Sequence, residues 1–148
     1  MKAISLWQPW ATLMALGYKT IETRGWRTNY RGPLLIHAAQ KKVKMDYDFN
    51  KLICKLVQNP LGFPYGAIVC KVDLIECQIM TARNVPSPES LEYELGYYVV
   101  GRYMWITEKS LMFNHPIPWK GSQGFFDVPD EIVNKEIQRI GHCTHNQS

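Results

Sequence analysis

Three charged side chains stand close together near the N-terminus, in the order Lys19, Glu22 and Arg24. A carboxylate between two cations can stay ionised, while the cations grip a phosphate or the edge of a nucleobase. In a regular strand Glu22 and Arg24 share one face and Lys19 points to the other. The three side chains therefore converge only if Lys19 lies on a turn or a bulge interrupts the strand. The alternative is a surface Glu22–Arg24 ion pair, which contributes little to stability.

Basic residues are concentrated around this triplet. The segment 19–44 holds one acid, Glu22, against the basic residues Lys19, Arg24, Arg27, Arg31, Lys41, Lys42 and Lys44, whereas the whole chain of 148 residues has a net charge of +4. A basic stretch on a nearly neutral body is typical of a surface that binds a polyanion, and it fits nucleic acid better than a generally basic surface does. The alternative is a solvated face whose lysines solubilise a helix.

Other residues nearby are candidates for contacting a base or moving a proton. Trp26 lies between Arg24 and Arg27, where its ring can stack on an unpaired base. Gln8 lies at the predicted start of the first helix, where free N–H groups attract phosphate, although it can equally cap that helix. His37 can act as an acid or base near neutral pH, although a lone histidine is more often structural. The predicted binding residues are Gln8, Lys19, Glu22, Arg24, Trp26, Arg27 and Arg31.

These residues are carried by strands and helices that alternate along the chain. Short apolar or alternating runs bounded by turn residues predict strands over residues 3–7, 19–24, 34–39, 67–79, 102–107 and 125–128. Apolar residues at helical spacing predict helices after Pro9, over residues 49–57 and after Pro129. The segment 81–101 is predicted to be a loop with one helical turn after Ser87, and it is a candidate lid. The mixture predicts an α+β fold.

Composition is that of one ordinary globular domain, 1–148, with 46% hydrophobic and 20% charged residues. No run approaches the roughly 20 apolar residues of a membrane span. Gln8-Pro9 interrupts the only stretch that resembles a signal peptide, so we expect a cytoplasmic protein with no membrane partner. No glycine-rich phosphate loop or dinucleotide fingerprint is present, so we expect no cofactor.

The four cysteines lack the paired spacings of zinc sites and redox motifs, which predicts reduced thiols. Cys70 and Cys77 are an odd number of residues apart, so in one regular strand they face opposite sides of the sheet. His142, Cys143 and His145 near the C-terminus have helix-like spacing for a metal but lack a fourth ligand. We therefore expect no metal.

Motifs spread along the chain resemble those of the ASCH family. They are residues 6–11 (LWQPWA), 17–26 (GYKTIETRGW), 31–32 (RG), 37–39 (HAA), 66–69 (GAIV), 72–77 (VDLIEC), 103–106 (YMWI) and 123–128 (QGFFDV). The resemblance covers about residues 3–128 and leaves a C-terminal helix and tail over 129–148. It implies a PUA-like small β-barrel flanked by helices, with RNA, another single-stranded nucleic acid or a nucleoside bound in a cleft beside the barrel.

The same resemblance implies two classes of function. Some bacterial relatives resemble amidohydrolases acting on acetylated cytidine and others have been assigned ribonuclease activity, whereas the eukaryotic namesake domain belongs to a transcriptional coactivator. For a metal-independent hydrolase, the candidate catalytic residues are Lys19, Glu22 and His37. The acetylcytidine-hydrolysing relatives have a threonine three residues after the lysine, where this chain has Glu22, and this favours binding over that activity. A protein-interaction surface of aromatic residues is a third hypothesis.

Overall fold

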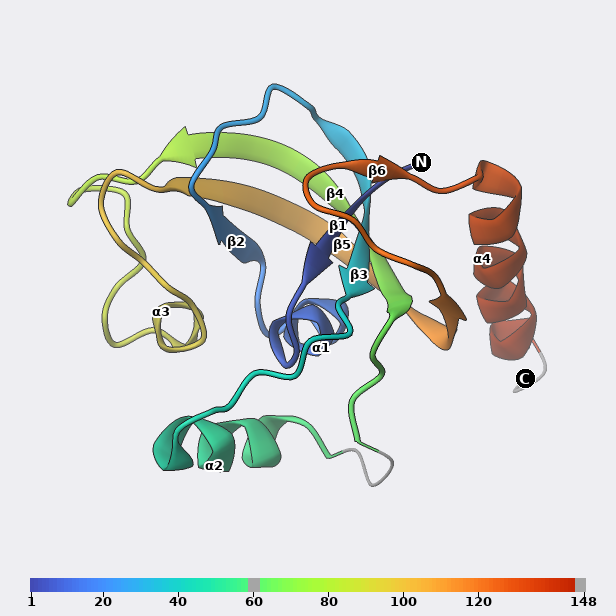
Figure 1. Ribbon diagram of the computed structural model, residues 1–148, viewed down its shortest axis with the longest axis horizontal. Helices are drawn as coiled ribbons and strands as arrows, with labels where there is room; N and C mark the ends of the chain where they lie inside the picture. The colour runs from blue at the N-terminus through green and yellow to red at the C-terminus, as the bar shows by residue number, and fades with distance from the viewer. Residues whose placement is uncertain (59–61, 146–148) are drawn as a thin grey trace.

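The structure is a computed structural model that describes residues 1–58 and 62–145, the last three of these by their backbone alone. The strands are β1 (Lys2–Leu6), β2 (Ile21–Arg24), β3 (Gly32–Ala38), β4 (Ala67–Ile79), β5 (Tyr103–Pro118) and β6 (Phe126–Asp127). The helices are α1 (Trp10–Ala15), α2 (Tyr47–Leu56), α3 (Leu91–Glu94) and α4 (Asp130–His145). Figure 1 shows the long strands β4 and β5 arching over α1, with α2, α3 and α4 around them. The predicted α+β class is confirmed.

Six strands form one sheet in the order β2-β5-β4-β3-β1-β6. The β1–β3 pair is parallel and the other pairs are antiparallel. Because β2 and β6 remain as edges, the sheet is open and the small closed barrel is not confirmed. The sheet nevertheless curves strongly, since Arg24 Nη2 at the end of β2 donates to the carbonyl oxygen of Ser5 in β1 at 2.7 Å. Two strands that are far apart in the sheet order therefore lie side by side.

Both faces of the sheet are buried at β3. Leu34 and Ile36 in β3 face the cluster around α1, and Leu35 between them packs in the cluster that contains Val133 of α4. A third cluster joins Leu13 of α1 to residues of α2 and of the α3 segment. α1 is thus enclosed, which fixes the start of the segment leading to β2. No helix within the described ranges is long and apolar enough to cross a membrane.

Several strands differ in their bounds from the sequence prediction; β3, for example, begins at Gly32, where a turn was predicted. β5 runs on to Pro118, although Pro116 and Pro118 predicted a turn-rich connection there. Pro118 still pairs with Ala67, at the first residue of β4, where a missing N–H interrupts the ladder least. β2 begins at Ile21 rather than at Lys19. The prediction of β4 over 67–79 is confirmed residue for residue.

The cysteines are free thiols at positions 54, 70 and 77. Cys70 and Cys77 lie in the same core cluster rather than on opposite faces. The reason is that β4 is not regular: its register against β5 shifts between Leu74 and Glu76, and a bulge re-aims the residues that follow it. Of the C-terminal candidates, His142 is exposed, and the side chains of Cys143 and His145 lie outside the described part of the chain.

Candidate functional site

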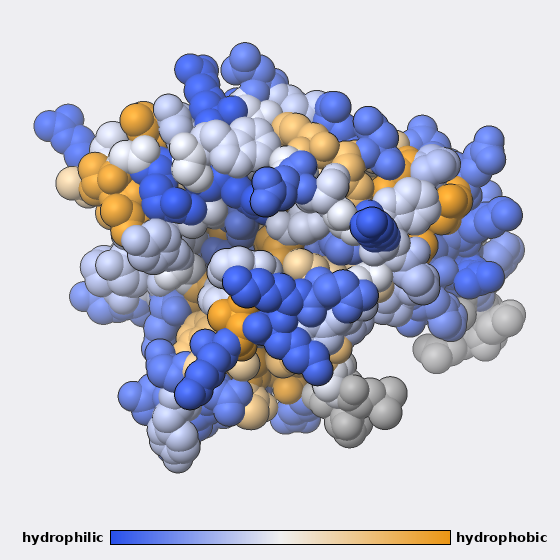
Figure 2. Space-filling model, in the orientation of Figure 1, coloured by the Kyte–Doolittle hydropathy of each residue, from blue (hydrophilic) through white to orange (hydrophobic). Residues whose placement is uncertain are grey.

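A cleft of about 1240 Å³ lies where the curved sheet brings β2 close to β1. Its walls are the ends of β1, β2 and β3, the segment 96–102 and the loop 119–124. The centre of the face in Figure 2 is hollowed between the sheet and the segment leading to α2. The charged residues that line the cleft are Lys19, Glu22, Arg24, Arg102 and Lys120. The cleft therefore carries more positive than negative charge.

Lys19 lies in the turn between α1 and β2, because β2 begins only at Ile21. This position brings it to the same cleft as Glu22 and Arg24, as the turn alternative required. Its side chain is only 2% exposed, yet Nζ has no hydrogen-bond partner among the residues that the structure describes. Glu92 Oε1 lies 3.7 Å from Nζ. Burial lowers the pKa of Lys19, while the Glu92 and Glu22 carboxylates oppose the shift.

Glu22 and Arg24 lie two residues apart on β2 and form a half-buried ion pair, with Arg24 Nε 3.4 Å from Glu22 Oε1. That contact lacks hydrogen-bond geometry, and Arg24 Nε is a buried atom with no hydrogen-bond partner. Burial raises the pKa of Glu22, while the charges of Arg24, Lys19 and Arg102 pull it back down. The pair is therefore no simple surface salt bridge.

Arg102 is a third cation of the cleft, and the sequence did not single it out. It lies one residue before β5, where Nη2 donates to the carbonyl oxygen of Thr23 at 3.1 Å and the guanidinium packs 5.2 Å from the centre of the Tyr97 ring. Its Nε is also buried without a hydrogen-bond partner. Arg102 lies far along the chain from the basic segment 19–44, so a search for clustered charge misses it.

Two exposed tryptophans line the same cleft. Trp26 is 38% exposed and is held edge-on by Trp105 and Phe125, with ring centres 4.7 and 5.6 Å apart. Trp7 is 48% exposed, and Lys41 Nζ lies 4.8 Å from the centre of its ring. Anchored rings with free surface beside cations are suited to stacking on flat, electron-rich groups.

The ASCH domain family profile matches residues 4–117, which is most of the chain and includes the walls of the cleft other than the loop 119–124. The chain belongs to the ASCH domain family. This membership confirms the resemblance drawn from the sequence motifs.

Relatives of this ASCH domain include Activating signal cointegrator 1 from Homo sapiens, 38% identical over 80 residues, and its Mus musculus counterpart, 36% identical over 80 residues. Each match covers 50% of this chain but only 14% of the relative. A crystal structure of ASCH from Zymomonas mobilis matches with a TM-score of 0.59 and 15% identity, over 93% of both chains. At that identity the structural match supports the fold alone.

Three of the predicted binding residues are not brought into the cleft of this ASCH domain. Arg27 is exposed outside it, and Arg31 instead pairs with Glu76 at 2.8 Å. Gln8 is 3% exposed: its Nε2 donates to the carbonyl oxygen of Pro64 at 2.9 Å, and its Oε1 accepts from Thr12 N–H at 3.0 Å. The Gln8 side chain therefore accepts a hydrogen bond from the first turn of α1. This matches the second interpretation of Gln8 drawn from the sequence, as a residue that caps the helix.

Replacing Gln8 tests this assignment. Gln8→Ala leaves the Thr12 N–H and the Pro64 carbonyl without their partner, and we expect a loss of about 1 to 3 kcal/mol in the free energy of unfolding. Urea denaturation of the wild type and the variant measures it. Ligand affinity of the folded variant should stay within about twofold. A stable variant with weakened binding would place Gln8 at the ligand instead.

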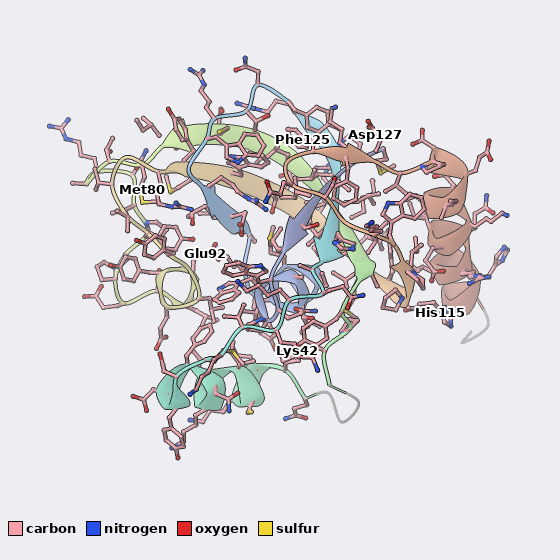
Figure 3. The ribbon with its side chains drawn as sticks, in the orientation of Figure 1. Lys42, Met80, Glu92, His115, Phe125 and Asp127 are labelled. Atoms are coloured by element: carbon pink, nitrogen blue, oxygen red, sulfur yellow. The ribbon has the colours of Figure 1, made fainter. Side chains whose placement is uncertain are left out.

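Glu92 connects the segment 81–101 to the start of β2. Its carboxylate accepts from the backbone N–H groups of Thr20 and Ile21 at 3.1 and 2.7 Å and from the Tyr98 hydroxyl at 3.0 Å. Figure 3 shows Glu92 projecting from the α3 segment toward the end of the molecule that holds β2. The segment 81–101, the candidate lid, is thus hydrogen-bonded to the start of β2. In this structure it forms a wall of the cleft beside Lys19.

His37 is buried beside the cleft, with both ring nitrogens engaged. Nδ1 lies 2.8 Å from Ser5 Oγ and Nε2 lies 2.7 Å from the carbonyl oxygen of Trp119. A carbonyl can only accept, so Nε2 carries the proton and, in the neutral ring, Nδ1 accepts from the Ser5 hydroxyl. Burial lowers the pKa of His37, against the opposing hydrogen bond to Trp119, which favours the neutral ring.

Proposed function

We propose that this ASCH domain binds RNA, as a single strand or as a nucleotide, in the cleft between β2 and β1. The observation that carries the proposal is the convergence of Lys19, Arg24 and Arg102 on one cleft, each with a buried nitrogen that lacks a hydrogen-bond partner. Buried N–H groups without partners are costly, and cationic ones more so. A phosphate in the cleft would offset the mutual repulsion of the three cations, which the carboxylates of Glu22 and Glu92 compensate only in part.

The aromatic residues of the cleft support a ligand with bases. Trp26 and Trp7 both line it and both expose ring surface. A phosphate held by the cations would place the attached base within the same cleft. Stacking tolerates any base, so this arrangement favours unpaired nucleotides over a duplex.

Removing the Trp26 ring tests the stacking role. We expect Trp26→Ala to weaken binding of a single-stranded RNA oligomer by about 1 to 3 kcal/mol, or roughly 5- to 150-fold. Fluorescence anisotropy with labelled RNA measures the affinity. Tyr47, an exposed aromatic residue on α2 that lies outside the cleft, provides the matched control, and Tyr47→Ala should leave affinity unchanged. Equal effects of the two substitutions would contradict a stacking role for Trp26.

The proposal itself is tested by titrating the protein with single-stranded RNA, single-stranded DNA and mononucleotides at several salt concentrations. If the three cations contact phosphate, log K should fall against log salt with a slope of roughly −2. Arg27→Ala and Arg31→Ala serve as controls, because these residues carry the same charge in the same segment but lie outside the cleft. Absence of binding at low salt would overturn the proposal.

A second candidate is a metal-independent hydrolase of RNA or of an acylated cytidine. The observation favouring it is that burial shifts the pKa of Lys19 down and that of Glu22 up, so both move toward neutral pH, as in sites of acid–base catalysis. Incubation with labelled RNA and with acetylcytidine tests it. Turnover that disappears in Glu22→Gln would favour catalysis. Binding without turnover would contradict the hydrolase and support only the binding proposal.

A further inference from the structure

We propose that Ser5 and His37 form a nucleophile–base pair, and that the cleft hydrolyses carboxylic esters that carry an anionic group. The proposal goes beyond RNA binding, because it assigns a reactive atom to a part of the cleft that the binding account does not use. It shares with that account only the cations that attract the anion.

The pair is built by the sheet. Ser5 in β1 is the register partner of His37 in the parallel strand β3, so their side chains emerge next to each other on one face. The hydroxyl donates to Nδ1 at 2.8 Å, and the Trp119 carbonyl fixes the opposite nitrogen at 2.7 Å. A nucleophile bonded to a base that a third group orients is the recurring geometry of covalent catalysis.

The Ser5 hydroxyl, rather than the His37 ring, is the group that can contact a substrate. Both ring nitrogens of His37 are occupied and its side chain is only 2% exposed. Ser5 is half-buried and lines the cleft. His37 therefore exchanges protons at Nδ1, the nitrogen beside Ser5 Oγ, because Nε2 is held by the Trp119 carbonyl.

Gly121 lets the loop 119–124 cover the pair. A Cβ at this position would come 2.5 Å from Ser5 Oγ and 2.7 Å from His37 Nδ1, closer than side-chain atoms pack. Only glycine permits this approach, so the loop excludes water from one side of the pair while the other side faces the cleft. A serine–histidine contact with only a structural role would not have to face a cleft, whereas a catalytic pair must.

Positive charge lies beside the nucleophile. Arg24 Nη2 donates to the backbone carbonyl of Ser5 at 2.7 Å, and Arg24 Nε has no hydrogen-bond partner. Such a fixed cation suits the oxyanion that forms when a hydroxyl attacks a carbonyl. Lys19 and Arg102 line the same cleft, where they would hold an anionic group of the ester.

The reaction needs only water as a second reactant. Ser5 Oγ attacks the carbonyl carbon while its proton passes to His37 Nδ1. The bond from that carbon to the alkoxy oxygen then breaks, and His37 returns the proton to the departing alcohol. Water attacks the acyl-serine by the same proton exchange, which releases the carboxylic acid and restores the Ser5 hydroxyl.

The test is covalent labelling of the full chain with an alkyl fluorophosphonate, located by peptide mass spectrometry. We expect one label on Ser5, none on the Ser5→Ala variant, and labelling slowed at least about 100-fold by His37→Gln. Ser87→Ala, which removes an exposed hydroxyl outside the cleft, is the matched control and should label normally. Steady-state hydrolysis should favour mono-4-nitrophenyl succinate over 4-nitrophenyl acetate by about tenfold, because only the former is anionic.

A second variant covers the case in which His37→Gln fails to fold. In Ser5→Cys the introduced thiol keeps its base, and Cys54 is an exposed thiol elsewhere in the same chain. Iodoacetate should alkylate position 5 faster than Cys54 at pH 7. Faster alkylation of Cys54 together with unlabelled wild-type Ser5 would overturn the proposal. RNA binding retained by Ser5→Ala would show that RNA binding does not depend on the Ser5 hydroxyl, so the two proposals can be tested independently.

Discussion

Lys19→Met is expected to weaken RNA binding at least about 30-fold and, at the same time, to raise the melting temperature. Removing a buried charge that contacts a ligand costs about 2 kcal/mol or more. In the free protein, however, burial lowers the pKa of Lys19 against the opposing charges of Glu92 and Glu22, so the charged form costs stability, and methionine fills a similar volume without that cost. Glu92 keeps its three other donors, so the loss of its counter-ion is partly compensated.

Thermal denaturation and anisotropy titration of the same preparations measure both effects. Lys55→Met on α2 is the matched control, because Lys55 is exposed and lies outside the cleft. Unchanged affinity would remove Lys19 from the ligand site. A large fall in melting temperature would mean that the Lys19–Glu92 pair stabilises the fold. The Lys19 charge would then have a structural role rather than a ligand-binding one.

Arg24→Ala is expected to lower both affinity and stability, the latter by about 1.5 to 3 kcal/mol at pH 7. The substitution removes the bond to the Ser5 carbonyl across the curved sheet and leaves the Glu22 carboxylate without its partner. Burial already raises the pKa of Glu22, so the folded state holds its proton more tightly than the unfolded state does. Ionised Glu22 therefore costs stability above its unfolded pKa, and loss of Arg24 increases that cost.

The sign of this effect gives a specific pH dependence. The destabilisation by Arg24→Ala should shrink as the pH falls from 7 toward 5, because Glu22 becomes protonated in the folded variant. Adding Glu22→Gln should restore part of the loss at pH 7. Urea denaturation at both pH values measures this, with Arg31→Ala as the control from an exposed pair. A pH-independent loss that Glu22→Gln does not rescue would assign the effect to the Ser5 bond alone.

The sequence predicts the elements of this fold better than it predicts their contacts. The β-branched run of β4 marks its limits, and the triplet Lys19, Glu22 and Arg24 does line the cleft. The alternation of side chains along a strand also indicated that Lys19 can join Glu22 and Arg24 only if it lies before the strand. These inferences succeed because they depend on neighbours a few residues apart.

The partners that come from distant segments could not be predicted in this way. Arg102 reaches the cleft, and Glu92 reaches Lys19, because the chain that enters β5 lies next to β2, and no local pattern marks either residue. The bulge between Leu74 and Glu76 in β4 has no sequence signature, so the parity argument for Cys77 failed. The choice between capping and binding for Gln8 was open from the sequence for a similar reason, since its second partner, Pro64, lies beyond α2.

The most direct measurement of the central claim is photocrosslinking of the intact chain to a short single-stranded RNA that carries 4-thiouridine, followed by peptide mass spectrometry. We predict crosslinks to peptides that contain Trp7, Trp26 or Trp119, which all line the cleft, and their loss in Lys19→Met. Crosslinks confined to α2 or α4, or crosslinks that Lys19→Met leaves unchanged, would contradict RNA binding in this cleft.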